Sequence, residues 1–164
     1  MNEIITERLS ILPMSESETE KLIEKTKPFD PELAEAYGEM LSGARENPEQ
    51  YDWYAVLEIK RRSDGKTVGD ACFKGLPENG FPEIGYGIHD DEQNKGYATE
   101  AVRALCAWAL AQNGVNGVEA EVEESNEKSK KVIFKCGFEP NGTIGKEGPR
   151  FTLKRIRRKN TACE

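Results

Sequence analysis

Residues 83–112 (EIGYGIHDDEQNKGYATEAVRALCAWALAQ) constrain the fold most, because two hydrophobic periodicities meet within this stretch. Apolar residues alternate with polar or small ones up to His89, as in a strand, and they recur at helical spacing after Tyr97. A polar loop with one glycine, Gly96, joins the two patterns. The sequence therefore predicts a strand, a glycine-bearing loop and a helix that runs to about Gln112.

The loop before this helix has the features of an anion-binding site. The first turn of a helix has backbone N–H groups without internal partners and carries the positive end of the helix dipole, so it can bind phosphate. Gly96 and Ala98 would let these N–H groups approach an anion closely, and Lys95 adds a positive charge. We interpret the loop as a pyrophosphate cradle, although a glycine before a helix is also ordinary turn chemistry. The P-loop and GxGxxG motifs are absent from the sequence.

The first part of the chain predicts one strand followed by two helices. Residues 4–12 are rich in β-branched and aliphatic side chains and end at a proline, which favours a strand. Ser15 can cap a helix over about 15–27, and Pro31 suits the first turn of a second helix. Residues 15–50 carry ten acidic against four basic side chains, so this helical region is acidic.

Three consecutive antiparallel strands are predicted next, because β-rich runs are separated by turn residues. An Asp64-Gly65 turn joins the first two runs as a hairpin. The predicted strands are 51–59, 67–74 and 83–89.

The remaining elements follow the long helix. A strand over 115–123 returns across a helical crossover, which requires a parallel neighbour and predicts a mixed sheet. Apolar residues at helical spacing and a terminal glycine predict another helix within 125–138. Residues 143–156 can supply a final hairpin.

Two motifs resemble those of a known enzyme superfamily. Residues 93–98 (QNKGYA) resemble the Q/R-x-x-G-x-G/A acetyl-coenzyme A signature of the GNAT superfamily of N-acetyltransferases. The strings TERL at 6–9 and IGYGIHDDEQNKGYATEA at 84–101 are similar to its RimJ/RimL-like branch, the ribosomal-protein N-acetyltransferases. Residues 125–138 resemble the family segment N-x-x-S…K-x-G-F, matched here by Asn126, Ser129, Lys135, Gly137 and Phe138.

The resemblance covers about residues 5–157 and implies the fold. We expect an α/β (α+β) protein with a GNAT-like mixed, mostly antiparallel sheet of about six to seven strands, flanked by about four helices. A single N-acetyltransferase domain is expected over 1–164, with its core over 5–157 and a disordered tail over 158–164.

The resemblance also implies the reaction, which is transfer of an acetyl group from acetyl-coenzyme A (acetyl-CoA) to a primary amine by direct attack. Acetyl-CoA is the expected cosubstrate, and no metal is expected because the chain has a single histidine. Backbone N–H groups near Ile88 and Asp90 are expected to pair with the pantetheine arm and to polarise the carbonyl. For Asn126 and Lys131 the alternatives are a helix cap and a solvated lysine. The expected cofactor-binding residues are Ile88, Asp90, Gln93, Asn94, Lys95, Gly96, Tyr97, Ala98, Thr99, Asn126, Ser129 and Lys131.

Three residues are candidates for acid–base catalysis. Glu83 is the candidate general base, because acids on this strand act in several relatives, and its alternative is a surface carboxylate. Histidine titrates near neutral pH, so His89 is a second candidate, with a solvated strand-end histidine as its alternative. Ser129 could donate a proton or bind coenzyme A, or it could be a buried helix serine. Two positions depart from the family, because Ile133 replaces the tyrosine that often acts as the acid and Gly87 replaces a common tryptophan.

Composition excludes several classes of protein. A chain of 164 residues suits one domain, and a net charge of −7 with a pI near 5.0 argues against nonspecific nucleic-acid binding. The basic run KRIRRK at 154–159 is interpreted as a solvated end of the last strand. No membrane span or secretory signal is visible, so a cytoplasmic location is expected. The four cysteines form no CxxC pair and are expected to be reduced thiols.

The sequence thus predicts an N-acetyltransferase, with the acceptor left open. The first acceptor class is a protein N-terminal amine, and the second is a small amine such as a polyamine, an amino acid or an amino sugar. Because the usual tyrosine is Ile133, a noncatalytic acyl-CoA-binding regulatory module is a third hypothesis. Homodimers are common in this fold, and neither nucleic acid nor a membrane is an expected partner.

Overall fold

The structure is a computed structural model that describes residues 1–156 of the chain. Within this range, eight strands form two antiparallel sheets, with the orders β1-β2-β3-β4-β5 and β6-β8-β7. The predicted α/β class is confirmed, with eight strands rather than six to seven and five α-helices rather than four. The predicted tail over 158–164, the cysteine Cys163 and the last three residues of the KRIRRK run lie outside the described residues.

The elements have the following bounds. The strands are β1 (Ile4–Ile5), β2 (Leu9–Pro13), β3 (Leu57–Arg61), β4 (Thr67–Phe73), β5 (Ile84–Ile88), β6 (Gly117–Glu121), β7 (Glu139–Ile144) and β8 (Pro149–Lys154). The helices are α1 (Glu16–Thr26), α2 (Pro31–Glu46), α3 (Tyr51–Tyr54), α4 (Tyr97–Ala111) and α5 (Glu127–Lys135). Two short 3-10 helices are η1 (Pro48–Gln50) and η2 (Asp90–Glu92).

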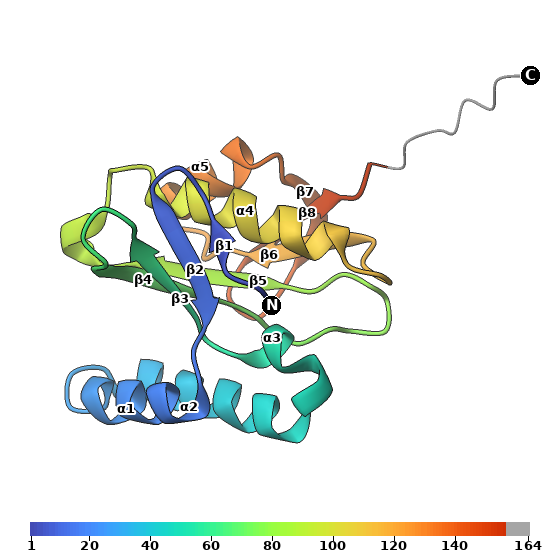
Figure 1. The fold of residues 1–164 in the computed structure, drawn as a ribbon. Helices are drawn as coiled ribbons and strands as arrows, with labels where there is room; N and C mark the ends of the chain where they lie inside the picture. Colours follow the sequence, from blue (N-terminus) through green and yellow to red (C-terminus); the bar gives the residue numbers. More distant parts are fainter. Residues whose placement is uncertain (157–164) are drawn as a thin grey trace, which may run out of the picture.

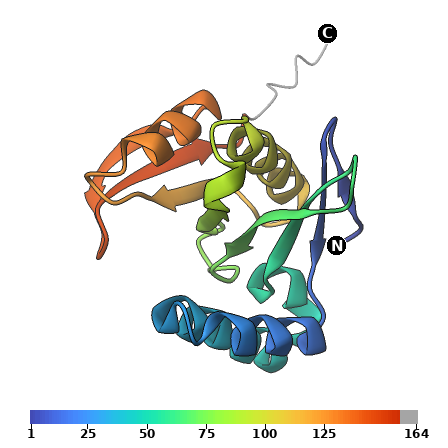
Figure 2. The same ribbon diagram turned by 90° about the vertical axis from the view of Figure 1, so that its left-hand side faces the viewer.

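Helices cover both faces of the larger sheet. The pair α1–α2 lies on one side and α4 lies on the other, an order that both views show (Figures 1 and 2). Helix α5 lies beside α4, next to the smaller sheet (Figure 1). The core forms where α4 packs on the larger sheet, and it contains fully buried side chains such as Ile11, Ile59, Val68, Val102 and Leu105.

The two sheets touch at the start of β5 and then separate. Among the described residues, a single parallel bridge between Glu83 and Glu119 joins β5 to β6. The predicted parallel neighbour of β6 is therefore present at this bridge, while along its length β6 pairs with β8 in a second, antiparallel sheet. From Ile84 to Ile88, β5 pairs on one side with β4. The opposite edge of β5 faces the gap between the sheets, where its backbone can meet a ligand.

The first predicted strand is in fact a hairpin. Residues 4–12 were expected to form one strand, but β1 folds back on β2 with Ile4 opposite Ile11. Thr6 closes the turn, since its hydroxyl accepts a hydrogen bond from the Leu9 N–H at 2.9 Å. Alternating apolar residues do not reveal a turn of this kind, because a threonine side chain makes it.

The predicted strand over 51–59 begins six residues late. Tyr51–Tyr54 forms the helix α3, and the strand starts at Leu57. Trp53 is buried against two aromatic rings, with centroids 5.1 Å from Phe73 and 4.7 Å from Trp108. This packing overrides the β-propensity of the aromatic residues.

Several other predicted elements are confirmed. Ser15 caps α1 in a capping box with Glu18, and Asp30 caps α2 just before Pro31. The β3–β4 hairpin turns at Gly65, whose φ of +72° suits glycine. The final hairpin starts at Glu139, four residues earlier than predicted.

The described part of the chain also bears on cysteines, metals and membranes. Cys72 and Cys106 are buried, Cys136 is partly buried, and all three are free thiols. No group of three or more metal-ligating side chains is found within residues 1–156. Over the same residues, no helix has the length and apolar character needed to span a bilayer.

Candidate active site

The site begins at the loop before α4. Gly96 is the N-cap of α4 with a φ of +82°, and no side chain caps the helix. Asn94 also has a positive φ, 62°, so the chain makes a tight turn that favours small or amide side chains. The N–H groups of the first helical turn, from Tyr97 to Thr99, are left for an outside acceptor.

A buried carboxylate, Glu92, stabilises this loop through ion pairs. Glu92 is only 3% exposed, and it pairs with Lys66 at 2.6 Å, Lys95 at 2.8 Å and Arg61 at 2.8 Å. The Lys66 and Lys95 hydrogen bonds, helped by the charge of Arg61, lower the pKa of Glu92 to about 2. Lys95 was expected to add charge to the phosphate cradle, but its ammonium group is turned toward Glu92.

The β1–β2 turn fastens the loop from the other side. Glu100 accepts hydrogen bonds from the Thr6 hydroxyl at 2.7 Å and from the Arg8 N–H at 2.8 Å. The Arg8 guanidinium also bonds Glu100, donates to the Lys95 carbonyl at 2.7 Å and lies 4.7 Å above the Tyr97 ring. These contacts explain why the TERL string and the glycine loop occur in one chain, since the first positions the second.

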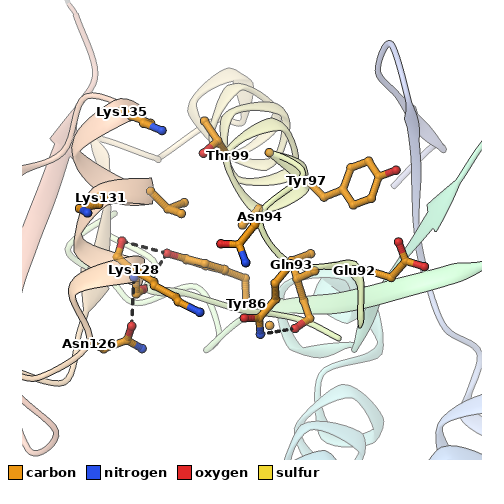
Figure 3. A pocket seen from close by; sticks show the side chains of 16 residues that line it. Tyr86, Glu92, Gln93, Asn94, Tyr97, Thr99, Asn126, Lys128, Lys131 and Lys135 are labelled. Carbon is orange, nitrogen blue, oxygen red and sulfur yellow. Dashed lines mark hydrogen bonds between the residues drawn. The ribbon is translucent and has the colours of Figure 1, made fainter. Parts of the chain in front are cut away.

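Helix α5 forms the opposite wall of the site. Asn126 caps this helix by accepting the Ser129 N–H at 3.0 Å. The Ser129 hydroxyl lies 2.7 Å from the hydroxyl of Tyr86, which reaches across from β5 (Figure 3). The pair therefore joins β5 to α5 across the gap between the sheets.

A cavity of about 630 Å³ lies between these walls. Its lining residues are Tyr86, Gly87, Ile88, Glu92, Gln93, Asn94, Gly96, Tyr97, Ala98, Thr99, Asn126, Lys128, Ser129, Lys131, Val132 and Lys135. A second hollow of about 670 Å³ shares Gly96, Thr99 and Lys135 with the first and adds Arg8 and Arg103. The two hollows therefore adjoin at the start of α4.

A comparison with protein-family models decides the family. The model of the acetyltransferase (GNAT) domain matches residues 7–139, which is most of the chain. The chain belongs to this GNAT family. The class of acyltransferases that the sequence predicted is thereby confirmed at the level of the family.

Curated relatives agree with this assignment. The chain is 32% identical over 80 residues to the uncharacterized N-acetyltransferase p20 of Bacillus licheniformis, covering 48% of this chain and 45% of that protein. It is 28% identical over 87 residues to the uncharacterized N-acetyltransferase YoaA of Bacillus subtilis, covering 52% of this chain and 49% of that one. The matches thus span about half the length of these relatives.

Solved structures of other GNAT proteins share the fold. Apo RimL, a ribosomal L7/L12 alpha-N-protein acetyltransferase, superposes with a TM-score of 0.73 at 15% identity, covering 96% of this chain and all of its own. The microcin C7 self-immunity acetyltransferase MccE, in complex with acetyl-CoA and AMP, superposes with a TM-score of 0.68 at 18% identity, covering 91% and 93%. The predicted GNAT-like fold is confirmed.

The GNAT cavity contains most of the residues expected to bind the cofactor. All of them line it except Asp90 and Lys95, whose carboxylate and ammonium groups bond Gln93 and Glu92 instead. Sequence reasoning missed Tyr86 and the two lysines Lys128 and Lys135. The helical spacing of these lysines from Lys131 was the available signal.

Of the three predicted catalytic residues, one lies in the cavity and two lie outside it. Ser129 lines the cavity, whereas Glu83 and His89 are not among the described residues around it. The Glu83 carboxylate pairs with Lys74 and with Arg150 at 3.1 Å, and Arg150 also binds Glu119 at 2.7 Å. This ion-pair cluster lies at the single bridge between the sheets. His89 is exposed at the end of β5.

The residues of the cavity suit acetyl-CoA, which carries phosphates at one end and a thioester on a narrow arm at the other. The uncapped start of α4 offers N–H donors to a pyrophosphate, as the sequence predicted. Lys128, Lys131 and Lys135 line the opposite wall and supply positive charge (Figure 3). The arm would reach the gap beside β5, where Tyr86 and Ser129 meet.

Proposed function

We propose that this protein is a GNAT N-acetyltransferase that moves an acetyl group from acetyl-CoA to a primary amine by direct attack. The chain would act as one domain. The observation that carries this proposal is the continuous cavity that joins the uncapped start of α4 to the hydroxyl pair of Tyr86 and Ser129. One end suits a pyrophosphate, and the other offers a proton donor at the gap between the sheets.

The chain's own residues can perform the binding. The N–H groups at Tyr97, Ala98 and Thr99 would bind the pyrophosphate, and the α5 lysines would neutralise further phosphate charge. Near Ile88 and Asp90, the edge of β5 without a strand neighbour can pair with an amide of the pantetheine arm. Bound acetyl-CoA would supply the activated acetyl group.

Ser129 would protonate the departing thiolate. Its hydroxyl lies in the cavity, and Tyr86 stands 2.7 Å behind it as a second hydroxyl. Burial raises the pKa of Tyr86 to about 12, so the phenol stays protonated at neutral pH. Together the two groups can replace the tyrosine that is absent at Ile133, a fully buried core residue.

For the acceptor, a protein N-terminal α-amine is the first proposal. RimL, named as a ribosomal L7/L12 alpha-N-protein acetyltransferase, is among the structural neighbours, and the TERL and IGYGIHDD strings support a RimJ/RimL-like branch. A small amine is the second proposal, because the family model and the curated relatives, named only as N-acetyltransferases, leave the acceptor open. A cytoplasmic location and a homodimer stay predictions.

Calorimetric titration with acetyl-CoA, followed by a thiol-release assay over N-terminal peptides and small amines, tests the proposal. Saturable binding with thiol release that depends on an amine is the expected result. Binding without release for any amine would instead favour a noncatalytic acyl-CoA-binding regulatory module. Failure to bind acetyl-CoA would overturn the proposed acetyltransferase function.

A further inference from the structure

The face of the larger sheet that α2 covers carries a carboxylate that the site described so far leaves out. Asp70 lies in the middle of β4, and the Tyr37 hydroxyl of α2 donates a hydrogen bond to it at 2.6 Å. Tyr37 is only 3% exposed, so the hydroxyl is a fixed donor. This contact fixes one carboxylate oxygen and leaves the other for a different partner.

The second oxygen of Asp70 is open to solvent. No further hydrogen bond to Asp70 comes from residues 1–156, yet every fully buried side-chain oxygen or nitrogen in that range has a partner. An oxygen without a partner must therefore be one that solvent reaches. A half-buried carboxylate with one fixed and one open oxygen is suited to receive an ammonium group.

Asp70 is paired in the sheet with a residue that lines the cavity, although Asp70 itself is not among the lining residues. In the sheet register it lies directly opposite Gly87 of β5, and Gly87 lines the acetyl-CoA cavity. Side chains of directly opposed residues share a face of the sheet. A side chain at Gly87 would meet no atom within 4 Å, so the space between Asp70 and the edge of β5 is open.

The neighbouring charges leave Asp70 without a permanent cation. Glu58, opposite Asp70 on β3, is compensated by the Thr67 hydroxyl at 2.6 Å and by Lys60 at 2.9 Å. Lys74, just after the end of β4, is paired with Glu83. The acidic helical region over 15–50 borders this face and favours a cationic ligand.

We propose that Asp70, oriented by Tyr37, binds the ammonium group of the acceptor and acts as the general base. This assignment rests on the proposed acetyl transfer. Asp70 takes one proton from the ammonium group and releases it to solvent, and the neutral amine attacks the acetyl carbonyl. The C–N bond forms, and the attacking nitrogen loses its second proton to Asp70, which again passes it to solvent. The C–S bond breaks, and the sulfur receives a proton from Ser129. Tyr86 returns a proton to Ser129, and solvent restores the phenol.

The titration of Asp70 is set by groups on every element that packs against it. Burial raises the pKa of Asp70, while the Tyr37 hydrogen bond and the charge of His89 lower it, with a net rise. Cys72 on the same strand stays neutral, because burial raises its pKa to about 11. A carboxylate with a raised pKa accepts a proton more readily at neutral pH, which suits a general base.

The test compares Asp70→Asn with Glu58→Gln, a matched change at the carboxylate directly across the sheet. Thiol release is measured with acetyl-CoA and either a serine-initiated peptide or spermidine. Asp70→Asn should lower kcat by about 10²-fold or more, with calorimetric acetyl-CoA binding unchanged, and Glu58→Gln should keep the wild-type rate. Equal rates for Asp70→Asn and wild type, or loss of rate in Glu83→Gln alone, would overturn the role of Asp70.

A second variant keeps the proposal testable if Asp70→Asn fails to bind acetyl-CoA. Tyr37→Phe removes the hydrogen bond that lowers the pKa of Asp70, so the acid limb of the kcat/KM profile should move to higher pH. An acid limb at the same pH in Tyr37→Phe and in the wild type would overturn the assignment of Asp70 as the general base. Wild-type protein that binds acetyl-CoA but releases no thiol with any amine would instead overturn the acetyltransferase proposal, and the role of Asp70 with it.

Discussion

The hydroxyl oxygen of Tyr86 on β5 lies 2.7 Å from the hydroxyl oxygen of Ser129 on α5. The Tyr86 hydroxyl is also 3.3 Å from the Ser129 carbonyl oxygen, so it can donate to either acceptor. These two residues are 43 positions apart in the chain, and they bridge the gap where the two sheets separate. A proton can pass between them without any movement of the backbone.

If this pair acts as one proton-donating unit, its two mutations should not be additive. Ser129→Ala should lower kcat by about 10²-fold, the usual benefit of a positioned acid, and Tyr86→Phe should lower it less. The double variant should be no slower than Ser129→Ala alone, because the tyrosine acts through the serine. Steady-state kinetics of the wild type, the two single variants and the double variant measures whether the losses in kcat are additive.

Tyr51→Phe is the matched control, since the Tyr51 hydroxyl bonds the Met14 carbonyl at 2.7 Å away from the cavity. It should leave kcat unchanged. Additive losses for Tyr86→Phe and Ser129→Ala would show that the two hydroxyls act independently.

The glycine of the loop should be required for cofactor binding. Gly96→Val forces a β-branched residue into a φ of +82° and places its Cβ 3.2 Å from the Arg8 guanidinium. The chain can relieve a strain of about 1–2 kcal/mol by shifting the loop, and acetyl-CoA would then have to restore the strained geometry on binding, so we expect roughly a tenfold loss of affinity. Calorimetry measures the loss, and Gly142→Val, at a φ of +80° in the β7–β8 hairpin, controls for strain alone. Equal acetyl-CoA affinity for Gly96→Val and wild type would show that the loop before α4 does not bind the cofactor.

The buried Glu92 should make the loop sensitive to acid. Its pKa is about 2 in the folded chain, below the ordinary value of 4.5, so its stabilising effect is complete above about pH 4.5 and lost as pH falls toward 2. Glu92→Gln should therefore lower Tm at neutral pH, and the difference from wild type should vanish near pH 2. Calorimetric scans between neutral pH and about pH 2 test whether the Tm difference shrinks as the pH falls.

Glu127→Gln serves as the reference for this experiment. Glu127 is largely exposed and pairs only with Lys130 on its own helix, so its removal should leave Tm nearly unchanged at every pH. A Tm difference for Glu92→Gln that grows as pH falls would contradict the proposed role.

The α5 lysines should contribute through charge. Lys131→Ala should weaken acetyl-CoA binding by about fivefold or less at low salt, since exposed charge pairs are worth up to about 1 kcal/mol. The loss should shrink as salt is raised, because exposed charges are screened. Titrations at two salt concentrations check this, with Lys25→Ala at the end of α1 as the control. A loss of affinity that is independent of salt would point to packing instead.

Local chemistry determined much of this protein from its sequence alone. The Ser15 cap, the Gly65 turn and the helix that follows Gly96 were predicted because each depends on hydrogen bonds or backbone angles within a few residues. The glycine-bearing loop was predictable for the same reason, since its glycine and its helix are adjacent in the chain.

Contacts between distant residues were decided only by the tertiary structure. Lys95 pairs with Glu92 and Glu83 pairs with Arg150, and neither ion pair could be read from the sequence. Tyr86 and Asp70 lie on opposite faces of neighbouring strands, and each forms a hydrogen bond with a residue of a helix far away in sequence. Strand register and helix packing bring such residues together, and the local sequence pattern predicts neither of them.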